Sequence, residues 1–441
     1  FVQDIFTPTS PAKINYIERE EINKRIVKAL RTKGMQIVIY GHSGSGKTTL
    51  LKNKLEQTYE RHVTTHCMEG MTYERILLDA FDRLSPFYTD EKITTEKTST
   101  GATIRTKFAS INAELSSTAE NGAQKKSRRV LPLQLTGANL ARMFGEANYC
   151  WVLEDFHKID ETDKKLISQL MKLFMDLSDE YGDLKIICVG AVNTARQVIE
   201  HDKEMKRRVA EIHIPLMLDK EIRKIVENGC EYLRVEIDDN AVSGICDESN
   251  GVASICHHLC SLMCDEQDIY ETVDEDSDSL KFDYSNLASA RGEYLHYASD
   301  TIKKALDNAL KLRGSDNVIR ALSEIGNDGA VESEIVSKLW EKQLSNDELS
   351  VAEILEKLLT TKYGELLKYE DESHKYSFSD PFYQAFSTQY FRQKDSHSPK
   401  KKQTKKELVD TFNLAMRALE MDLSVSQSVG DSRGSHIGDF E

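Results

Sequence analysis

The sequence predicts an α/β protein with a P-loop type of parallel sheet, followed by a helical lid and a C-terminal winged helix-turn-helix domain. Short apolar runs of strand length alternate with helical patterns over the first half of the chain, as in parallel sheets covered on both faces. A glycine-rich stretch stands between the first apolar run and the next helix. The 441 residues, 39% hydrophobic and 30% charged, suffice for two or three domains with ordinary cores.

The first repeat of this pattern is a helix over 18–31, an apolar strand over 35–40 and a second helix over 47–61. Gly34 is expected to end the first helix. The later units are predicted as strands over 63–67, 149–153, 185–190 and 212–215 and helices over 73–84, 135–146 and 164–178. Residues 1–17, with Pro8 and Pro11, are expected to be loosely structured.

The expected domains are a core over 1–216, a helical lid with an acidic linker over 217–283, and a winged helix over 284–392. Alternating runs at 366–370 and 375–379 form the expected wing. An insertion at about 91–130, rich in Ser, Thr, Lys and Ala, is interpreted as solvated, and its basic run 125–129 leaves a partner or nucleic-acid contact open. The tail from 393 to 441 is expected to be disordered.

The composition limits the function classes. The formal net charge of −15 argues against broad nonspecific nucleic-acid binding but leaves room for a local basic patch. No apolar run reaches the length of a membrane span, and we expect no membrane partner. Eight scattered cysteines in a chain of this size indicate a reducing, cytoplasmic location.

A G-x-x-x-x-G-K-[ST] motif follows the first strand. In that context the glycines let successive backbone N–H groups point at phosphate oxygens, and the helix N-terminus adds positive charge. Lys47 is expected to reach the β and γ phosphates, and the Thr48 hydroxyl to bind Mg²⁺. The expected nucleotide-binding residues of the loop are Gly41, His42, Ser43, Gly44, Ser45, Gly46, Lys47, Thr48 and Thr49.

The strand at 149–153 ends in two carboxylates, Glu154 and Asp155. One acid at such a position holds the magnesium ion, and the other orients the attacking water. By position Glu154 is the magnesium acid and Asp155 the base. At sites of this kind the first acid is more often Asp, followed by Asp or Glu, whereas this sequence has Glu first. The division of the two roles between Glu154 and Asp155 therefore stays open.

Three further residues are catalytic candidates. Asn193 follows the strand at 185–190, where a polar side chain can sense the γ-phosphate; the alternative is a simple loop residue. Arg207 and Arg208 precede the last strand, where an arginine could reach a triphosphate in the same or a neighbouring subunit. The alternative for this pair is a solvated basic surface.

A helix in the lid carries Cys256, Cys260 and Cys264 on one face. Packing of small apolar side chains is favoured over a metal site, because zinc ligands usually come from loops or from two elements. His257 or His258 could instead approach the nucleotide.

These motifs resemble the AAA+ and STAND group of P-loop ATPases, in the branch of origin-recognition and NLR-like proteins. The resemblance covers about 10–392 and rests mainly on 41–48 and 151–155, with weaker support from 17–20, 206–212, 249–253 and 378–382. It implies ATP and Mg²⁺ as cofactors and places Arg19 near the adenine pocket. The lid departs from the family pattern, because Ala253 replaces the usual proline and no arginine stands in the usual lid position.

The resemblance implies a slow ATPase switch that couples nucleotide state to oligomers and to a protein effector, as in prokaryotic antiviral defence. The alternative is a DNA-binding ATPase of the replication-initiator or transposition type. A third hypothesis is a nucleotide-binding scaffold that scarcely hydrolyses.

Overall fold

The computed structural model describes residues 1–58, 61–84, 135–191, 198, 203–274, 280–344, 350–371 and 373–397. The predicted insertion, Asn193 and the tail from 398 on lie outside these residues. The chain forms two compact units, and each is considered separately. The first contains Phe1–His296 and Asp380–Phe382, and the second contains Tyr297–Ser379 and the described residues from Tyr383 on.

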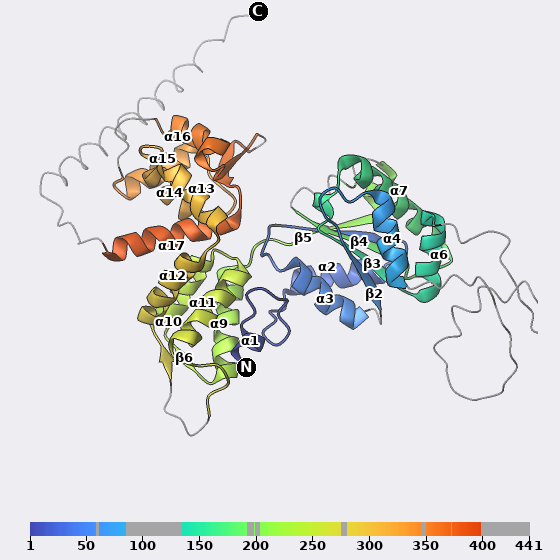
Figure 1. The fold of residues 1–441 in the computed structure, drawn as a ribbon, viewed down its shortest axis with the longest axis horizontal. Coiled ribbons are helices and arrows are strands. Elements are labelled where there is room, and N and C mark those ends of the chain that lie inside the picture. Colours follow the sequence, from blue (N-terminus) through green and yellow to red (C-terminus); the bar gives the residue numbers. More distant parts are fainter. Residues whose placement is uncertain are drawn as a thin grey trace, which may run out of the picture. The chain divides into compact units, whose positions relative to one another are not determined.

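The first unit is built on a five-stranded sheet of order β2-β3-β4-β1-β5, with every neighbouring pair parallel (Figure 1). The strands are β1 (Gln36–Tyr40), β2 (His62–His66), β3 (Cys150–Glu154), β4 (Lys185–Gly190) and β5 (Val209–His213). Tyr40 pairs with Gly190 and with His213, so the carboxyl ends of these strands meet at one edge. The predicted α/β fold class is confirmed.

Helices cover both faces of this sheet. Helices α2 (Glu20–Arg31) and α3 (Lys47–Thr58) pack with Ile37 and Ile39, while Val38 faces α4 (Tyr73–Leu84), α6 (Gly137–Ala147) and α7 (Glu161–Asp176). The three central strands β1, β3 and β4 are buried on both faces and mostly apolar, whereas β2 and β5 at the two sides of the sheet alternate buried and more exposed residues. The Trp151 indole lies fully inside the second face and donates to the Thr65 hydroxyl at 3.0 Å.

Most predicted boundaries agree with the structure to within a few residues, but the last strand does not. It was expected at 212–215 and lies at Val209–His213. Its register explains the difference, because Gln36 of β1 pairs with Val209 and the ladder ends at His213. Pro215 lacks the N–H that a longer strand would need.

The lid contains α9 (Asp219–Leu233), α10 (Asp239–Ser249) and α11 (Ala253–Glu266), with a short parallel pair β6 (Glu236–Ile237) and β7 (Lys281–Phe282). Helix α12 (Tyr284–Tyr297), expected in the C-terminal domain, packs on this lid. Arg291 of α12 forms an ion pair with Glu248, and Leu287 lies against Gly244. These buried contacts place most of α12 with the first unit.

The N-terminal residues are more ordered than the sequence suggested. Helix α1 (Val2–Ile5) packs on α9 and α11 of the lid, with Val2, Ile5 and Phe6 buried. Gly229 makes room for the Phe6 ring, because a Cβ at Gly229 would lie 2.3 Å from it. The loop that follows α1 therefore starts from a fixed point on the lid.

The second unit is mainly helical and contains one antiparallel hairpin, which precedes its last described helix. Leu367 of the first strand pairs with Phe378 of the second, and Tyr376 also bridges to Ala330. Its elements are α13 (Asp300–Leu310), α14 (Ser315–Ser323), α15 (Glu332–Glu341), α16 (Val351–Leu358), β8 (Leu367–Glu370) and β9 (Lys375–Phe378), with most of α17 (Pro381–His397).

Candidate nucleotide-binding site

The glycine-rich loop connects β1 to α3 through a backbone that requires glycine. A Cβ at Gly41 would lie 2.2 Å from the carbonyl oxygen of Ile214, which no side chain tolerates. Gly46 has φ +86°, in the left-handed region that glycine populates readily. The loop thus leads directly into the N-terminus of α3, where backbone N–H groups favour anions.

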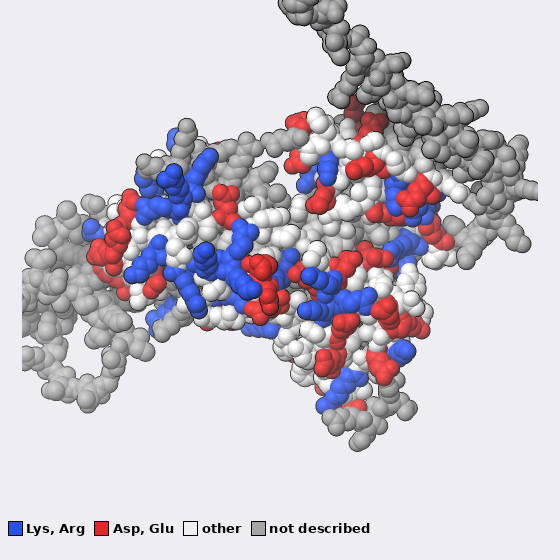
Figure 2. All heavy atoms as spheres, turned by 180° about the vertical axis from the view of Figure 1, so that it is seen from behind, with Lys and Arg blue, Asp and Glu red and all other residues white. Residues whose placement is uncertain are grey.

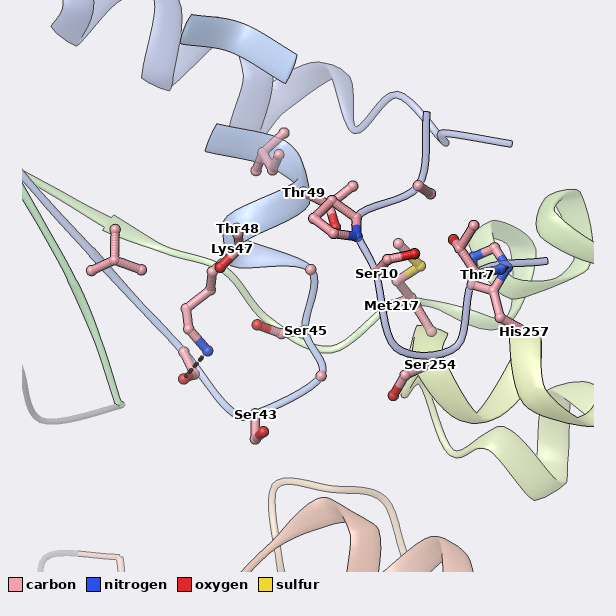
Figure 3. Close-up of a pocket in the computed structure, with 18 of the residues that line it drawn as sticks. Thr7, Ser10, Ser43, Ser45, Lys47, Thr48, Thr49, Met217, Ser254 and His257 are labelled. Carbon is pink, nitrogen blue, oxygen red and sulfur yellow. Dashed lines mark hydrogen bonds between the residues drawn. The ribbon is translucent and has the colours of Figure 1, made fainter. Parts of the chain in front are cut away.

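Lys47 folds back over this loop. Its Nζ donates to the carbonyl oxygen of Gly41 at 3.0 Å (Figure 3). It also donates to the carbonyl oxygen of His42 at 2.6 Å. Burial lowers the pKa of Lys47, and the nearby Asp155 carboxylate opposes that shift. The ammonium is thus held at the centre of the loop, where a phosphate group would replace the two carbonyls as its partner.

The loop forms one end of a cavity of about 570 Å³. The other end is formed by the segment 7–17 and by lid residues, among them Met217, Ser254 and His257 (Figure 3). Of the sequence-predicted residues, the cavity is lined by Gly41, Ser43, Gly44, Ser45, Gly46, Lys47, Thr48, Thr49, Arg19, Glu154 and Asp155. His42 contributes the carbonyl that accepts from Lys47.

Both carboxylates at the end of β3 have basic neighbours. A Glu154 oxygen lies 3.2 Å from His66 Nδ1, and β2–β3 pairing sets these two residues side by side. An Asp155 oxygen accepts from Lys158 Nζ at 2.7 Å, and Asp155 has the left-handed φ of +56°. Each acid is therefore oriented by its own partner rather than by the other acid.

The oxygen-bearing side chains at the loop end of the cavity fit a magnesium ion that is also bound by the phosphates of a nucleotide. Mg²⁺ takes oxygen ligands and usually one or two carboxylates beside substrate phosphates. Thr48 and Glu154 or Asp155 line the cavity together and supply such oxygens. Within the described residues there is no group of three or more His, Cys, Asp or Glu that could hold a metal ion.

Arg19 lines the cavity, but its guanidinium contacts protein. It donates to Pro215 O at 2.9 Å, Leu216 O at 3.2 Å and Glu221 Oε1 at 3.2 Å. The side chain is only 7% exposed. Arg19 therefore holds the connection between β5 and α9 in place beside the cavity.

Arg207 and Arg208 do not reach the cavity of their own chain. They precede β5, at the sheet edge opposite the glycine-rich loop, because Arg208 O accepts from Gln36 at the start of β1. Arg208 donates to Asp176 at 3.2 Å and to Met175 O at 2.6 Å. A contact with the triphosphate of a neighbouring subunit stays a prediction.

The cysteines, His257 and His258 of the lid lie in three different surroundings in the structure. All eight cysteines are free and buried, and burial raises the pKa of Cys264 to about 12. Within the described part of the chain, no metal cluster includes them. His257 lines the cavity, whereas His258 packs edge-on against Tyr294 at 5.2 Å.

Sequence reasoning missed the part of the cavity that comes from the N-terminal segment. Asn15 and Thr7 lie in a stretch whose apolar residues follow neither helical nor strand periodicity. His66 and Glu154 are far apart in the sequence and belong to no common motif. Asn15 donates to Ile225 O at 2.8 Å, a contact between residues far apart in the chain. Only the three-dimensional fold brings these groups together.

Residues 16–180 match the sequence model of a family described as AAA ATPase domain. No curated protein matches the chain. This match, the parallel sheet and the glycine-rich loop support an ATPase of the AAA+ type with a P-loop. Among the described helices, none is long and apolar enough to cross a membrane.

Solved structures of similar proteins include the Walker-type ATPase PABY2304 of Pyrococcus abyssi, with 15% identity and a TM-score of 0.48 over 84% of this chain and 96% of that one. Cdc6p of Pyrobaculum aerophilum has 12% identity and a TM-score of 0.42, over 90% and 99% of the two chains. The ORC2 protein of Aeropyrum pernix, in ADPNP–ADP complexes, has 13% identity and a TM-score of 0.43, over 88% and 98%.

Proposed function

We propose that this protein binds ATP with Mg²⁺, hydrolyses it slowly, and uses the nucleotide state to control oligomer formation and the binding of a partner protein. One observation carries the proposal: the glycine-rich loop, the two acids of β3 and the lid all line one cavity. A ligand in this cavity would touch the sheet and the lid at once.

The loop end of the cavity suits the triphosphate. Lys47 would hold the β and γ phosphates, and Ser45 Oγ is buried without a hydrogen-bond partner in the described part of the chain. Thr48 and Glu154 would bind Mg²⁺, which neutralises phosphate charge when it is bound. We assign Asp155 to orient and polarise the attacking water, with the reverse assignment of the two acids as the alternative.

The switch would act through the connection between β5 and α9. Arg19 holds residues 215 and 216 and pairs with Glu221 at the start of α9. A nucleotide can shift an equilibrium only by its difference in affinity for two states. We propose that its contacts with both the loop and the lid supply this difference.

Phosphate release and particle mass test the proposal separately. Phosphate release is expected to fall at least tenfold in Asp155→Asn, while Asp79→Asn, which pairs with Arg83 on α4 outside the cavity, keeps the rate of the native chain. Equal rates in the native chain and Asp155→Asn would instead favour a non-hydrolysing scaffold. Light scattering should show a larger mass with a non-hydrolysable ATP analogue than without nucleotide. An unchanged mass would remove the oligomer part of the proposal.

A DNA-binding ATPase is the second candidate. The first unit gathers Lys and Arg side chains on one face, with acidic residues beside them (Figure 2). The second unit combines helices with the hairpin β8–β9, the order of a winged helix. Gel shifts over a salt series decide this point, and binding that is absent even near ~50 mM salt would exclude it. Among the described residues, none points to an antiviral task in particular.

A further inference from the structure

The end of the cavity away from the glycine-rich loop combines apolar side chains with uncharged polar ones and Arg19. Pro11, Ile17, Met217 and Ile225 contribute apolar surface there. Among the lining residues the carboxylates are Glu154 and Asp155 alone, and both belong to the phosphate end. A site of this kind suits a flat heteroaromatic group that is recognised by a small number of hydrogen bonds.

Three buried polar atoms at this end have no hydrogen-bond partner among the described residues: Thr7 Oγ1, Asn15 Oδ1 and Ser254 Oγ. A buried polar atom without a partner loses its hydrogen bonds to water and gains none in the protein, which is unfavourable. Three such atoms at one end of one cavity therefore indicate a polar ligand. Asn15 lines the cavity and is only 1% exposed, so water does not replace the missing partner of its Oδ1.

The hydrogen bonds around the cavity fix the chemical character of two groups. Asn15 Nδ2 donates to Ile225 O at 2.8 Å, so the remaining Oδ1 is only an acceptor. His257 Nδ1 accepts from Thr7 N at 3.3 Å, which leaves the proton on Nε2. This end therefore presents a fixed acceptor and a fixed donor, with the hydroxyls of Thr7 and Ser254 able to serve in either role.

We propose that Asn15 selects adenine over guanine by accepting a hydrogen bond from the exocyclic 6-amino group of the base. Adenine offers this donor beside an acceptor nitrogen, which a hydroxyl of Thr7 or Ser254 can meet. Guanine presents a carbonyl oxygen at the same position, which would face the acceptor Asn15 Oδ1. This inference rests on the proposed nucleotide binding and names the residue that reads the base.

The test compares ATP with purine riboside triphosphate, which lacks only the 6-amino group, and with GTP, each with Mg²⁺ and the full chain. Titration calorimetry of the native chain is expected to give about tenfold weaker binding of purine riboside triphosphate than of ATP. GTP should bind at least as weakly. Asn15→Leu should bind ATP and purine riboside triphosphate with equal affinity, because the acceptor is gone.

Asn23→Leu is the matched control. Asn23 is also a buried asparagine, but it lies outside the cavity. Its Nδ2 donates to Glu18 at 3.0 Å, and its Oδ1 accepts from the Tyr16 hydroxyl at 3.4 Å. This variant should lose stability and keep the tenfold preference for ATP, so loss of packing alone would not imitate the effect.

The outcomes separate the two proposals. Equal affinity of the native chain for ATP and purine riboside triphosphate would overturn the role of Asn15 and leave nucleotide binding intact. A tenfold preference that persists in Asn15→Leu would assign base reading to another residue and would also overturn it. No binding of any triphosphate would remove the proposed function itself.

Discussion

The Arg19 guanidinium lies 3.2 Å from a carboxylate oxygen of Glu221, although 202 residues separate them in the chain. Two further bonds from the same guanidinium reach Pro215 O and Leu216 O. The segment before α2 is thus joined to the connection between the sheet and the lid. Because Arg19 also lines the cavity, this joint lies where a nucleotide would bind.

Arg19→Leu is expected to lower the free energy of unfolding by about 2–4 kcal/mol, because three acceptors lose a buried charged donor. Chemical denaturation measures this change. Lys24→Leu is the control, since the Lys24–Glu20 pair is largely exposed and screened by water, so its loss should leave the free energy of unfolding nearly unchanged. Equal losses in the two variants would mean that the Arg19 bonds do not hold the lid connection.

Arg291→Met should lower the free energy of unfolding more than Arg19→Leu does. Glu248, its partner at 3.2 Å, is fully buried and would lose its positive partner, which usually lowers stability by about 3–5 kcal/mol. The double variant Arg291→Met/Glu248→Leu is expected to recover most of this loss, because no unpaired charge remains. A double variant as unstable as Arg291→Met would argue against the ion pair as the link between α10 and α12.

His257 gives the lid a pH dependence. Burial lowers the pKa of His257 from 6.5 to about 4. Between these values the unfolded chain binds a proton that the folded chain does not, so stability falls as the pH drops from 6.5 towards 4. Asn at this position keeps an acceptor for Thr7 N but cannot be protonated.

Unfolding free energies of the native chain and of His257→Asn, measured between pH 7 and pH 5, test this point. The native chain should lose about 1–2 kcal/mol more than the variant over this range. His258 stays in both proteins, so its protonation cancels in the comparison. Identical pH profiles would show that His257 is not held in its neutral form.

Gly41→Ala is expected to disrupt the loop, because the new Cβ would lie 2.2 Å from the backbone oxygen of Ile214. Affinity for MgATP should fall at least tenfold, with a loss of stability. Gly326→Ala is the control, since a Cβ there has no neighbour within 4 Å. Thermal melting and calorimetry of both variants separate loop damage from general unfolding.

Local sequence features allowed correct predictions of the sheet and the loop. Apolar runs such as 36–40 are buried on both faces, and the motif at 41–48 needs only neighbouring residues to form. The position of α1 could not be predicted, because it depends on Gly229 making room for Phe6. Asn15 was missed for the same reason, since its amide is fixed by Ile225 O on α9.

The place of Arg207 and Arg208 relative to the cavity could not be predicted from the sequence. Arg207 and Arg208 stand next to a strand in the sequence, but the register of β5 on β1 decides which edge of the sheet they occupy. Pairing of Gln36 with Val209 puts them at the edge away from the loop. A sequence motif gives the side-chain chemistry, whereas the register of the sheet gives the position.

Titration calorimetry of the full chain with MgATP tests the central claim most directly. We expect saturable binding of one nucleotide per chain, and about 100-fold weaker binding in Lys47→Ala, because the ammonium in the loop is lost. Lys28→Ala, exposed on α2, should bind as the native chain does. Absence of heat with the native chain, or unchanged affinity in a folded Lys47→Ala variant, would contradict nucleotide binding at this loop.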